Sequence, residues 1–148
     1  MKATRLYEED FATTWAIVLD KGDEVVKTLT AFARDNTITA AHFTAIGAFS
    51  RATLGYFDRA RKDYKRIAVN AQVEVLSLIG DIALDGREPK LHAHVVLGTE
   101  DGTARGGHLL EALVWPTLEI VLTESPEHLR RKMDPEVGLA LIDLDAPR

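Results

Sequence analysis

The sequence predicts a single α+β domain in which one main helix packs on a mostly antiparallel β-sheet. Three observations lead to this class. Residues 24–34 have apolar side chains at helical spacing, whereas the later apolar segments are short and several of them alternate as strands do. The chain of 148 residues has a length that fits one domain. It contains no internal repeat and no low-complexity linker, so we treat residues 1–148 as one domain.

A strand followed by the helix opens the predicted fold. Residues 13–20, TTWAIVLD, alternate between apolar and polar around Trp15, which is typical of a half-buried strand. We predict Asp23 as the N-cap of the helix, with Glu24 in the first turn facing the positive end of the helix dipole. Apolar residues then recur at helical spacing, namely Val25, Val26, Leu29, Phe32 and Ala33. The helix is therefore predicted over residues 24–34.

The rest of the chain is predicted as strands separated by turn residues. The predicted segments are 38–49, 51–58, 64–70, 72–84, 91–98, 108–114, 117–124 and 138–145. Gly80 is predicted to mark a bulge or bend within its strand. Asp101 and Gly102 form a strong hairpin signal, and Pro116 is predicted to break or edge the strands on either side of it.

The composition limits where the protein works and what its sites contain. No apolar run approaches the roughly 20 residues that span a bilayer. The first residues, MKATRLYEEDF, place acidic groups where a signal peptide has its apolar segment, so we expect a cytoplasmic protein with no membrane partner. The chain contains no cysteine, and therefore no disulfide and no thiolate ligand. Any metal site must use His, Asp or Glu.

The charge balance argues against a large nucleic-acid surface. The formal net charge is −5, whereas non-specific affinity for nucleic acid rests on clustered Lys and Arg. The densest basic segment, DRARKDYKR, contains Arg59, Arg61, Lys62, Lys65 and Arg66. Because Asp58 and Asp63 interrupt it, we interpret it first as a solvated hairpin turn, with an anion-binding patch as the alternative.

A nearly unbroken apolar segment, LLEALVW at residues 109–115, predicts self-association. A strand that is apolar on both faces is normally buried on both faces. One helix covers only one face of a sheet, and the chain offers little else for the other face. We therefore expect a homo-oligomer.

Three of the five histidines lie in one glycine-rich stretch, LHAHVVLGTEDGTARGGHL, residues 91–109. On a strand, His92 and His94 point to the same face, about 6–7 Å apart. A hairpin at residues 101–102 brings His108 back beside them, and the two preceding glycines permit a bulge or a close backbone approach. Three neutral imidazoles with an open fourth position are typical of a catalytic zinc site. The alternative is that these are polar residues on one face of a sheet.

Other polar residues carry weaker expectations. Glu74 lies in an otherwise apolar strand, where it is either a salt-bridge or subunit contact, or a fourth ligand or general acid/base. We interpret Glu111 as an exposed strand residue, His42 as a polar residue on a mostly apolar strand and His128 as exposed. The sequence lacks the phosphate-binding, dinucleotide-binding, G-x-S-x-G and H-E-x-x-H motifs.

The order of these motifs resembles the PPC domain, the plant and prokaryote conserved domain. The resemblance covers about residues 15–124. Its parts are KGDEVVKTLTAFARDNTITAAHFTAIGAF, ATLGYFD, EVLSLIGDIAL and LHAHVVLGTEDGTARGGHLLEALVWPTLEIVL. The H-x-H, the Asp-Gly turn, the Gly-Gly-His and EIVL, in that order, are the most specific part. The resemblance implies an α+β fold that assembles as a homotrimer.

The resemblance also carries two functional expectations. The fold is similar to that of acetolactate decarboxylase, a zinc lyase that holds its metal by His-x-His and a later histidine. Carried over, the ligands here are His92, His94 and His108, although the gap to the third histidine differs and that enzyme's other active-site residues have no match. Plant PPC domains follow an AT-hook that grips the minor groove of DNA, and prokaryotic members are often labelled DNA-binding by association. This chain has no hook.

Three hypotheses follow. The first is a trimeric PPC protein of undefined biochemical role that binds a divalent metal, zinc, near its subunit interfaces, with a further protein or small-molecule partner. The second is a zinc-dependent lyase or hydrolase acting on a small oxygenated substrate, with Glu74 as acid/base. The third is a DNA-associated regulator whose trimer gathers the basic segments at 59–66 on one face. The acidic charge makes DNA the least expected partner.

Overall fold

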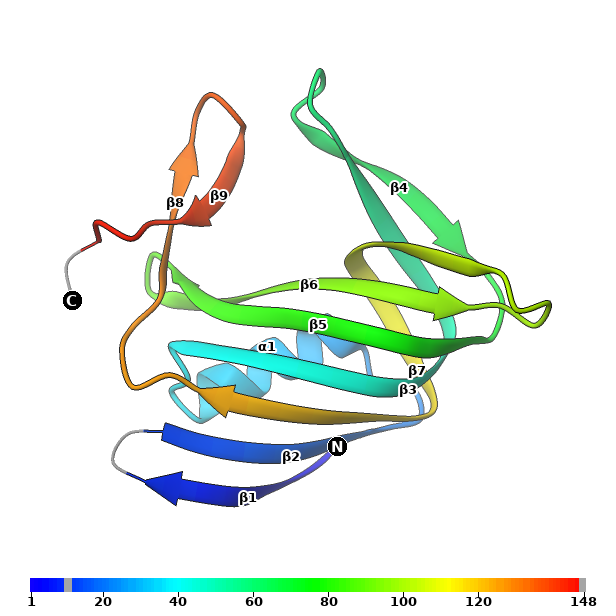
Figure 1. The fold of residues 1–148 in the computed structure, drawn as a ribbon, viewed down its shortest axis with the longest axis horizontal. Coiled ribbons are helices and arrows are strands. Elements are labelled where there is room, and N and C mark those ends of the chain that lie inside the picture. Colours follow the sequence, from blue (N-terminus) through cyan, green and yellow to red (C-terminus); the bar gives the residue numbers. More distant parts are fainter. Residues whose placement is uncertain (10–11, 147–148) are drawn as a thin grey trace.

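A computed structural model describes residues 1–9 and 12–146. Within that range a nine-stranded sheet curves over one helix (Figure 1). The elements are β1 (Lys2–Glu9), β2 (Ala12–Asp20), α1 (Val25–Asp35), β3 (Ala40–Asp58), β4 (Asp63–Val69), β5 (Val73–Asp85), β6 (Glu88–Gly98), β7 (Ala104–Glu124), β8 (Arg130–Asp134) and β9 (Leu139–Ile142). The strand order is β1-β2-β7-β3-β5-β8-β9, with β4 paired to β3, and β6 paired to β5 and β7. The predicted α+β class with a mostly antiparallel sheet is confirmed; the described pairs are antiparallel except β5 with β8.

The N-cap of the helix is one residue later than predicted. Glu24, and not Asp23, is the N-cap, because its carboxylate accepts hydrogen bonds from the backbone N–H of Lys27 at 2.7 Å and of Val26 at 3.4 Å. The same carboxylate accepts from the N–H of Ala112 on β7 at 3.1 Å. Asp23 instead accepts from the N–H of Asp20 at 3.0 Å and closes the turn before the helix. The side chain of Glu24 thus joins the start of the helix to β7.

Two predicted strand breaks are bends inside longer strands. Segments 38–49 and 51–58 are one strand, β3, and segments 108–114 and 117–124 are one strand, β7. The Trp115–Pro116 peptide bond is cis, and β7 continues through it. Both strands keep pairing with each other across shifts in register, so a glycine or a proline bends them without ending them.

Two strands were not predicted at all. All eight residues of β1 are exposed, so the strand has no apolar face that could be recognised in the sequence. β8 is the basic, polar segment RRKMD, and it is placed by pairing with β5 and β9. Gly80 also differs from expectation, since the shift in the β5–β6 register lies at residues 75–77 and Gly80 pairs regularly.

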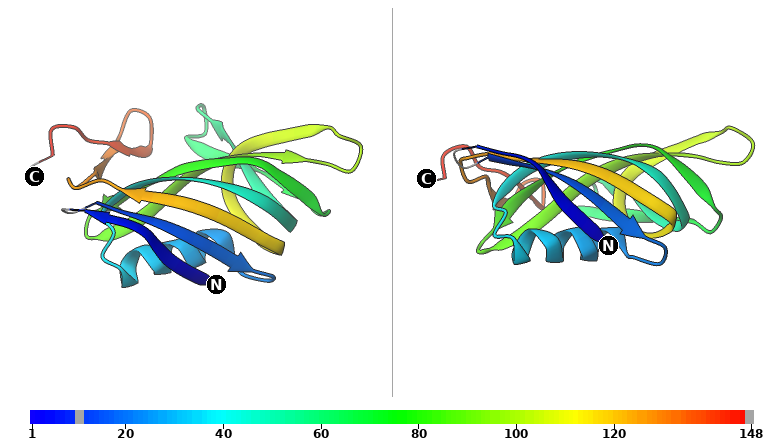
Figure 2. Two further views of the ribbon diagram at one scale, coloured as in Figure 1. Left: turned by 60° about the horizontal axis from the view of Figure 1, so that its bottom comes forward. Right: turned by 90° about the horizontal axis from the view of Figure 1, so that it is seen from below.

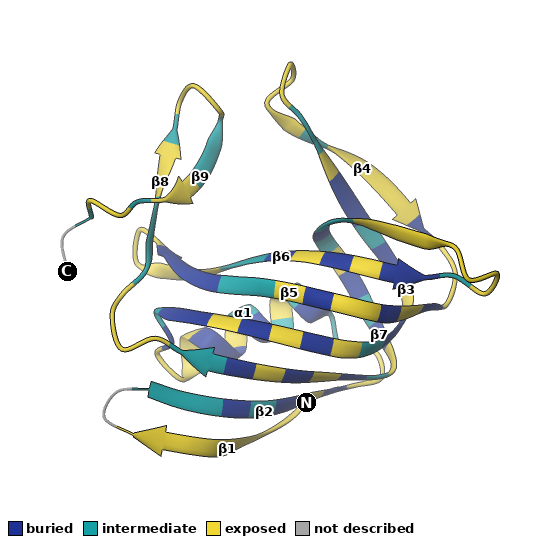
Figure 3. Ribbon diagram, viewed as in Figure 1, coloured by how far each residue is buried: buried dark blue, intermediate teal, exposed yellow. Residues whose placement is uncertain are grey.

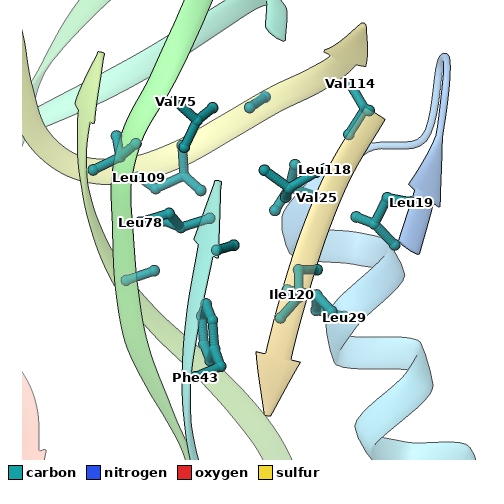
Figure 4. Packing of buried hydrophobic residues seen from close by; sticks show 14 of the residues in the cluster. Leu19, Val25, Leu29, Phe43, Val75, Leu78, Leu109, Val114, Leu118 and Ile120 are labelled. Carbon is teal, nitrogen blue, oxygen red and sulfur yellow. The ribbon is translucent and has the colours of Figure 1, made fainter. Parts of the chain in front are cut away.

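The helix covers one face of the sheet, and the core lies between them (Figure 2). Along β2, β3, β5, β6 and β7, buried and exposed residues alternate (Figure 3). Leu29 of the helix and Leu118 and Ile120 of β7 belong to this core (Figure 4). Trp15 packs edge-on against Phe32, with ring centroids 5.2 Å apart. The pattern of period two therefore decides which residues face the helix.

The opposite face, which we call the outer face, exposes apolar side chains that no described element covers. They are Val18, Ile46, Leu76, Ile79, Val96 and Val121, from five different strands. Ile46 and Ile79 are 61% and 55% exposed. The predicted uncovered apolar surface is present, but most of it lies on this face rather than at residues 109–115, where the side chains alternate between buried and partly buried or exposed. No helix among the described residues has the length and apolar character needed to cross a membrane.

Gly47 allows the backbone of β3 to lie unusually close to the backbone of β7, its paired strand. Its φ is +151°, and an added Cβ would lie 2.3 Å from the carbonyl oxygen of Thr117 and 2.9 Å from the Cα of Leu118. Both atoms belong to backbone, so neither can move aside alone. We expect Gly47→Ala to lower the free energy of unfolding by about 3 kcal/mol or more in urea titrations. Gly22→Ala is the control, because φ is +88° there but no atom lies within 4 Å, so about 1 kcal/mol is expected. Equal losses in the two variants would contradict this account.

Candidate metal centre

Three imidazoles meet on the outer face where β6 and β7 pair. His92 and His94 lie on β6 and point to the same side, and His108 of β7 is the cross-strand partner of His94. The ring centroids are 5.2 Å apart for His92 and His94, 5.1 Å for His92 and His108, and 5.4 Å for His94 and His108. One nitrogen from each ring lies within 4.8 Å of the other two. The juxtaposition predicted from the hairpin is confirmed.

The hairpin that brings them together is built as the sequence indicated. Gly102 has a φ of +79° and closes the turn through a hydrogen bond from its N–H to the carbonyl of Thr99 at 2.9 Å. Asp101 accepts hydrogen bonds from the hydroxyl of Thr99 and the N–H of Thr103, which together lower the pKa of its carboxyl to about 2. The carboxylate therefore stays ionised and fixes the turn throughout the range in which imidazoles titrate.

Gly106 and Gly107 allow β7 to approach its neighbours just before His108. A Cβ at Gly107 would lie 2.9 Å from the carbonyl oxygen of Gly55 on β3. A Cβ at Gly106 would lie 3.0 Å from the carbonyl oxygen of Val95 on β6. Of the two explanations for this glycine pair, a close backbone approach is the one observed, because the β6–β7 register runs without a shift from His94–His108 to the turn.

The environment keeps His108 in the form that binds metal. Burial first, and then the nearby His92, His94 and Arg131, lower the pKa of His108 to about 4. Burial and His92 also lower the pKa of His94. The ring of Tyr64 stacks on His108 with centroids 4.5 Å apart. The Nδ1 atom of His108 is buried and has no hydrogen-bond partner among the described residues, and a buried polar atom of this kind calls for a partner such as an ion. These features fit a metal ligand.

The carboxylate beside the cluster is Asp81, not Glu74. Asp81 of β5 is the cross-strand partner of His92, and its Oδ2 lies 3.6 Å from the Nδ1 of that ring. Glu74 faces Gly98 on β6, four residues beyond His94, or about 13 Å at the usual strand rise. Within this chain, Glu74 therefore lies outside the cluster of His92, His94 and His108. Asp81 was missed because the tight turn at Asp85 and Gly86, which pairs β5 with β6 and sets Asp81 opposite His92, was not recognised in the sequence.

Asp81 is itself held by an arginine. The Arg131 guanidinium donates a hydrogen bond to Oδ1 of Asp81, and its side chain is only 6% exposed. Burial alone raises the pKa of the Asp81 carboxyl, but His92 and Arg131 outweigh it, so the pKa lies below its ordinary value. Asp81 is therefore a carboxylate at neutral pH.

His128 and Glu111 are exposed, as predicted, and His42 is a polar residue of a mostly apolar strand, also as predicted. His42 is an exposed residue of β3 opposite Asp81, and with His92 and His94 it borders a shallow depression of about 380 Å³. Its place beside the cluster was not predicted. His128 is exposed and its Nδ1 lies 2.7 Å from the hydroxyl of Thr39. Glu111 is exposed and pairs with Arg66 at 2.7 Å.

The basic segment forms the tip of a hairpin, as predicted. Strands β3 and β4 make a projecting arm whose turn carries Arg59, Arg61 and Lys62, all of them exposed (Figure 1). Lys65 and Arg66 follow on β4 and are exposed as well. The ammonium of Lys62 donates to the carbonyl oxygen of Pro135, which joins the arm to the β8–β9 hairpin at 2.9 Å.

Residues 7–126 match the model of the Plants and Prokaryotes Conserved (PCC) domain. The chain belongs to this family. It is the family that the sequence motifs resemble, and the match covers β2 to β7, including all three histidines of the cluster. The β8–β9 hairpin, which supplies Arg131, lies beyond the matched residues of the PCC domain.

Solved structures of similar proteins support the assignment. A plant- and prokaryote-conserved (PPC) protein of Pyrococcus horikoshii is 34% identical with a TM-score of 0.84, covering 96% of this chain and 94% of that one. A metal-containing protein of Archaeoglobus fulgidus is 34% identical with a TM-score of 0.82, covering 94% and 99%. A "putative dna binding protein" of Bacteroides thetaiotaomicron VPI-5482 is 27% identical with a TM-score of 0.89, covering 97% and 99%.

More distant matches add less. A protein of Staphylococcus aureus similar to alpha-acetolactate decarboxylase shares the fold alone, at 13% identity and a TM-score of 0.54. The Bifunctional protein GlmU of Synechococcus sp. (strain JA-2-3B'a(2-13)) is 32% identical over 120 residues, which are 79% of this chain and 18% of that protein. The PCC domain described here thus spans about a fifth of the length of that relative. What these proteins have in common with this chain is the domain.

The lowered pKa of His108 makes the metal-free protein sensitive to acid. Its folded pKa of about 4 is below the ordinary value of 6.5, so the unfolded chain takes up a proton first and stability falls between those two pH values. The full shift corresponds to about 3 kcal/mol, and solvent at this half-buried site reduces the expected loss to about 1–2 kcal/mol.

Urea unfolding in a chelator at pH 7.5 and 4.5 measures this loss. His108→Gln is the comparison, because it removes the titrating group and leaves a polar side chain. We expect the wild-type chain to lose about 1–2 kcal/mol more than the variant over this range. An equal loss in both chains would show that His108 titrates normally.

Proposed function

We propose that this protein is a zinc-binding PCC domain whose ion is held by His92, His94 and His108. The observation that carries the proposal is the approach of three imidazole nitrogens to within 4.8 Å of one another on two paired strands. Without an ion, clustering three histidines brings no stabilisation, because a protonated ring disfavours protonation of its neighbours. A divalent ion removes that conflict by binding the neutral form of all three.

The donor set favours zinc over the other common divalent ions. Imidazole nitrogens suit zinc, whereas magnesium and calcium prefer oxygen ligands. Three protein ligands leave one tetrahedral position open. The metal-containing protein of Archaeoglobus fulgidus, which has 34% identity to this chain, supports a metal in this fold.

A zinc titration by calorimetry tests the proposal. The metal-free protein is expected to bind one zinc ion per chain. Magnesium and calcium at the same concentration are expected to give no heat of binding, because they need oxygen ligands and the three ligands here are nitrogen atoms. Binding of magnesium in place of zinc, or no binding of zinc, would contradict the assignment.

We also propose that the zinc site catalyses a hydrolase or lyase reaction. When bound, zinc lowers the pKa of a coordinated water and polarises a carbonyl oxygen. The depression of about 380 Å³ beside His92 and His94 gives a small oxygenated molecule access to the ion. Asp81 is the carboxylate beside the histidines, and its pairing with Arg131 keeps it ionised. A role in DNA binding receives no support from the net charge of −5.

We further propose that the outer face binds other copies of this chain, in the homotrimer that the family resemblance implies. Contiguous exposed apolar residues from five strands form a surface that a monomeric soluble protein rarely leaves in water. The apolar depression on this face is lined by Val18, Ile46, Leu76, Ile79 and Val121, and it shares Thr44 and Ile79 with the depression at the histidines. Association would therefore place a subunit boundary next to the metal site.

A further inference from the structure

The β8–β9 hairpin reaches the histidine cluster through two charged residues. Arg131 of β8 donates from one terminal nitrogen to Oδ1 of Asp81 and from the other to the carbonyl oxygen of Ala140, at 3.2 Å. The other carboxylate oxygen of Asp81 lies 3.6 Å from Nδ1 of His92. Arg131, Asp81 and His92 are thus in consecutive contact, and Arg131 belongs to a hairpin that lies beyond the matched family residues.

The backbone holds this hairpin to the sheet only lightly. β8 pairs with β5 through two residue pairs, Leu84 with Arg130 and Asp85 with Arg131. Leu84 donates a backbone hydrogen bond to the carbonyl oxygen of Leu129 at 2.7 Å. Side chains add two contacts: the buried guanidinium of Arg131 joins the hairpin to Asp81 of β5, and Lys62 of the β3–β4 arm donates to Pro135. Removing either partner of the Arg131–Asp81 pair leaves a buried charge without its ion-pair partner.

The position of Asp81 favours Nε2 of His92 as the nitrogen that binds an ion. A carboxylate beside Nδ1 favours a proton on that nitrogen, and the lone pair then resides on Nε2. Metal-bound histidines usually donate their second N–H to a carboxylate or a carbonyl, which sets the ring orientation and raises ligand basicity. Asp81 lies beside Nδ1 of His92 at 3.6 Å, and Arg131 donates a hydrogen bond to its other oxygen.

We infer that Asp81, clamped by Arg131 of the C-terminal hairpin, is the positioning residue that holds His92 in its Nδ1-protonated form for metal binding. The inference rests on the metal site proposed above. It adds that the hairpin outside the matched family residues belongs to the site. Loss of the Arg131–Asp81 contact is then expected to lower the affinity for the metal although all three histidine ligands are still present.

Competition of zinc with a chromophoric chelator measures the expected effect. Asp81→Asn is expected to weaken zinc binding 10- to 100-fold, and Asp81→Glu to recover part of the loss. Asp85→Asn is the matched control, because Asp85 lies on the same strand and pairs with Lys90 at 3.0 Å, away from the histidines. Zinc binding by Asp81→Asn within threefold of the wild type would overturn the inference.

Long-range ¹H–¹⁵N spectra of the metal-free wild type provide a readout that needs neither zinc nor a variant. At about pH 8, where imidazoles are neutral, His92 is expected to be protonated on Nδ1. If Asp81→Asn fails to fold, this spectrum alone decides, and protonation on Nε2 overturns the inference. A weakened zinc affinity with an unchanged His92 tautomer in Asp81→Asn overturns it as well. Failure of zinc to bind the wild type contradicts the proposed function, whereas the tautomer still tests Asp81.

Discussion

The double variant H92A/H94A is expected to retain less than a tenth of the zinc that the wild-type chain retains after dialysis. The two substitutions remove both ligands of β6 and leave His108 alone, and a single imidazole does not hold zinc against buffer. Both side chains lie on the outer face, half-buried or exposed, so no core packing is lost and the fold is expected to persist. Elemental analysis of the dialysed chains, together with circular dichroism, measures both quantities.

His128→Ala is the control for this variant. His128 is exposed and bonds to Thr39, outside the cluster, so its removal is expected to leave the zinc content unchanged. Undiminished zinc in a folded H92A/H94A chain would place the ion elsewhere. His92 and His94 would then be polar residues on one face of the sheet, as in the alternative interpretation.

Placing a charge on the outer face is expected to break the oligomer. Ile46 is 61% exposed near the middle of the apolar depression, and Ile46→Asp would force a carboxylate into any contact made there. Because burying an unpaired charge costs several kcal/mol, association is expected to weaken on the order of 100-fold or more. Light scattering of the purified wild type should give three times the mass of one chain, and the variant should give the mass of a single chain.

Leu144→Asp provides the matched control, since Leu144 is 88% exposed and does not line the apolar depression. It should leave the mass of the assembly unchanged. A wild-type chain that is monomeric at micromolar concentration, or an Ile46→Asp variant with the wild-type mass, would contradict self-association through this face.

Local signals in the sequence predicted the elements that local physics determines. The helix was recognised because its apolar residues recur every three or four positions, and the hairpin because Asp101 and Gly102 favour a tight turn. The cluster of His92, His94 and His108 followed from that hairpin alone. These features involve residues fewer than 20 positions apart in the chain, so the turn or the helical repeat itself determines which residues lie side by side.

The parts that could not be predicted depend on contacts between distant segments. β1 has no apolar face, and its place is set only by pairing with β2. Asp81 and Arg131 are 50 positions apart, and each is an ordinary charged residue until β8 pairs with β5. Glu74 was weighed as a site residue because it is the charged residue of an apolar strand. Its distance from the histidines is set by the β5–β6 register, which composition does not reveal.

Anomalous scattering at the zinc absorption edge, from crystals of the zinc-loaded protein, locates the ion directly. We expect one strong peak per chain, within about 2.0–2.1 Å of a ring nitrogen of His92, His94 and His108, with one coordination position left to solvent. A peak at another place, or no peak beside these three rings, would contradict the assignment of this cluster as the metal centre.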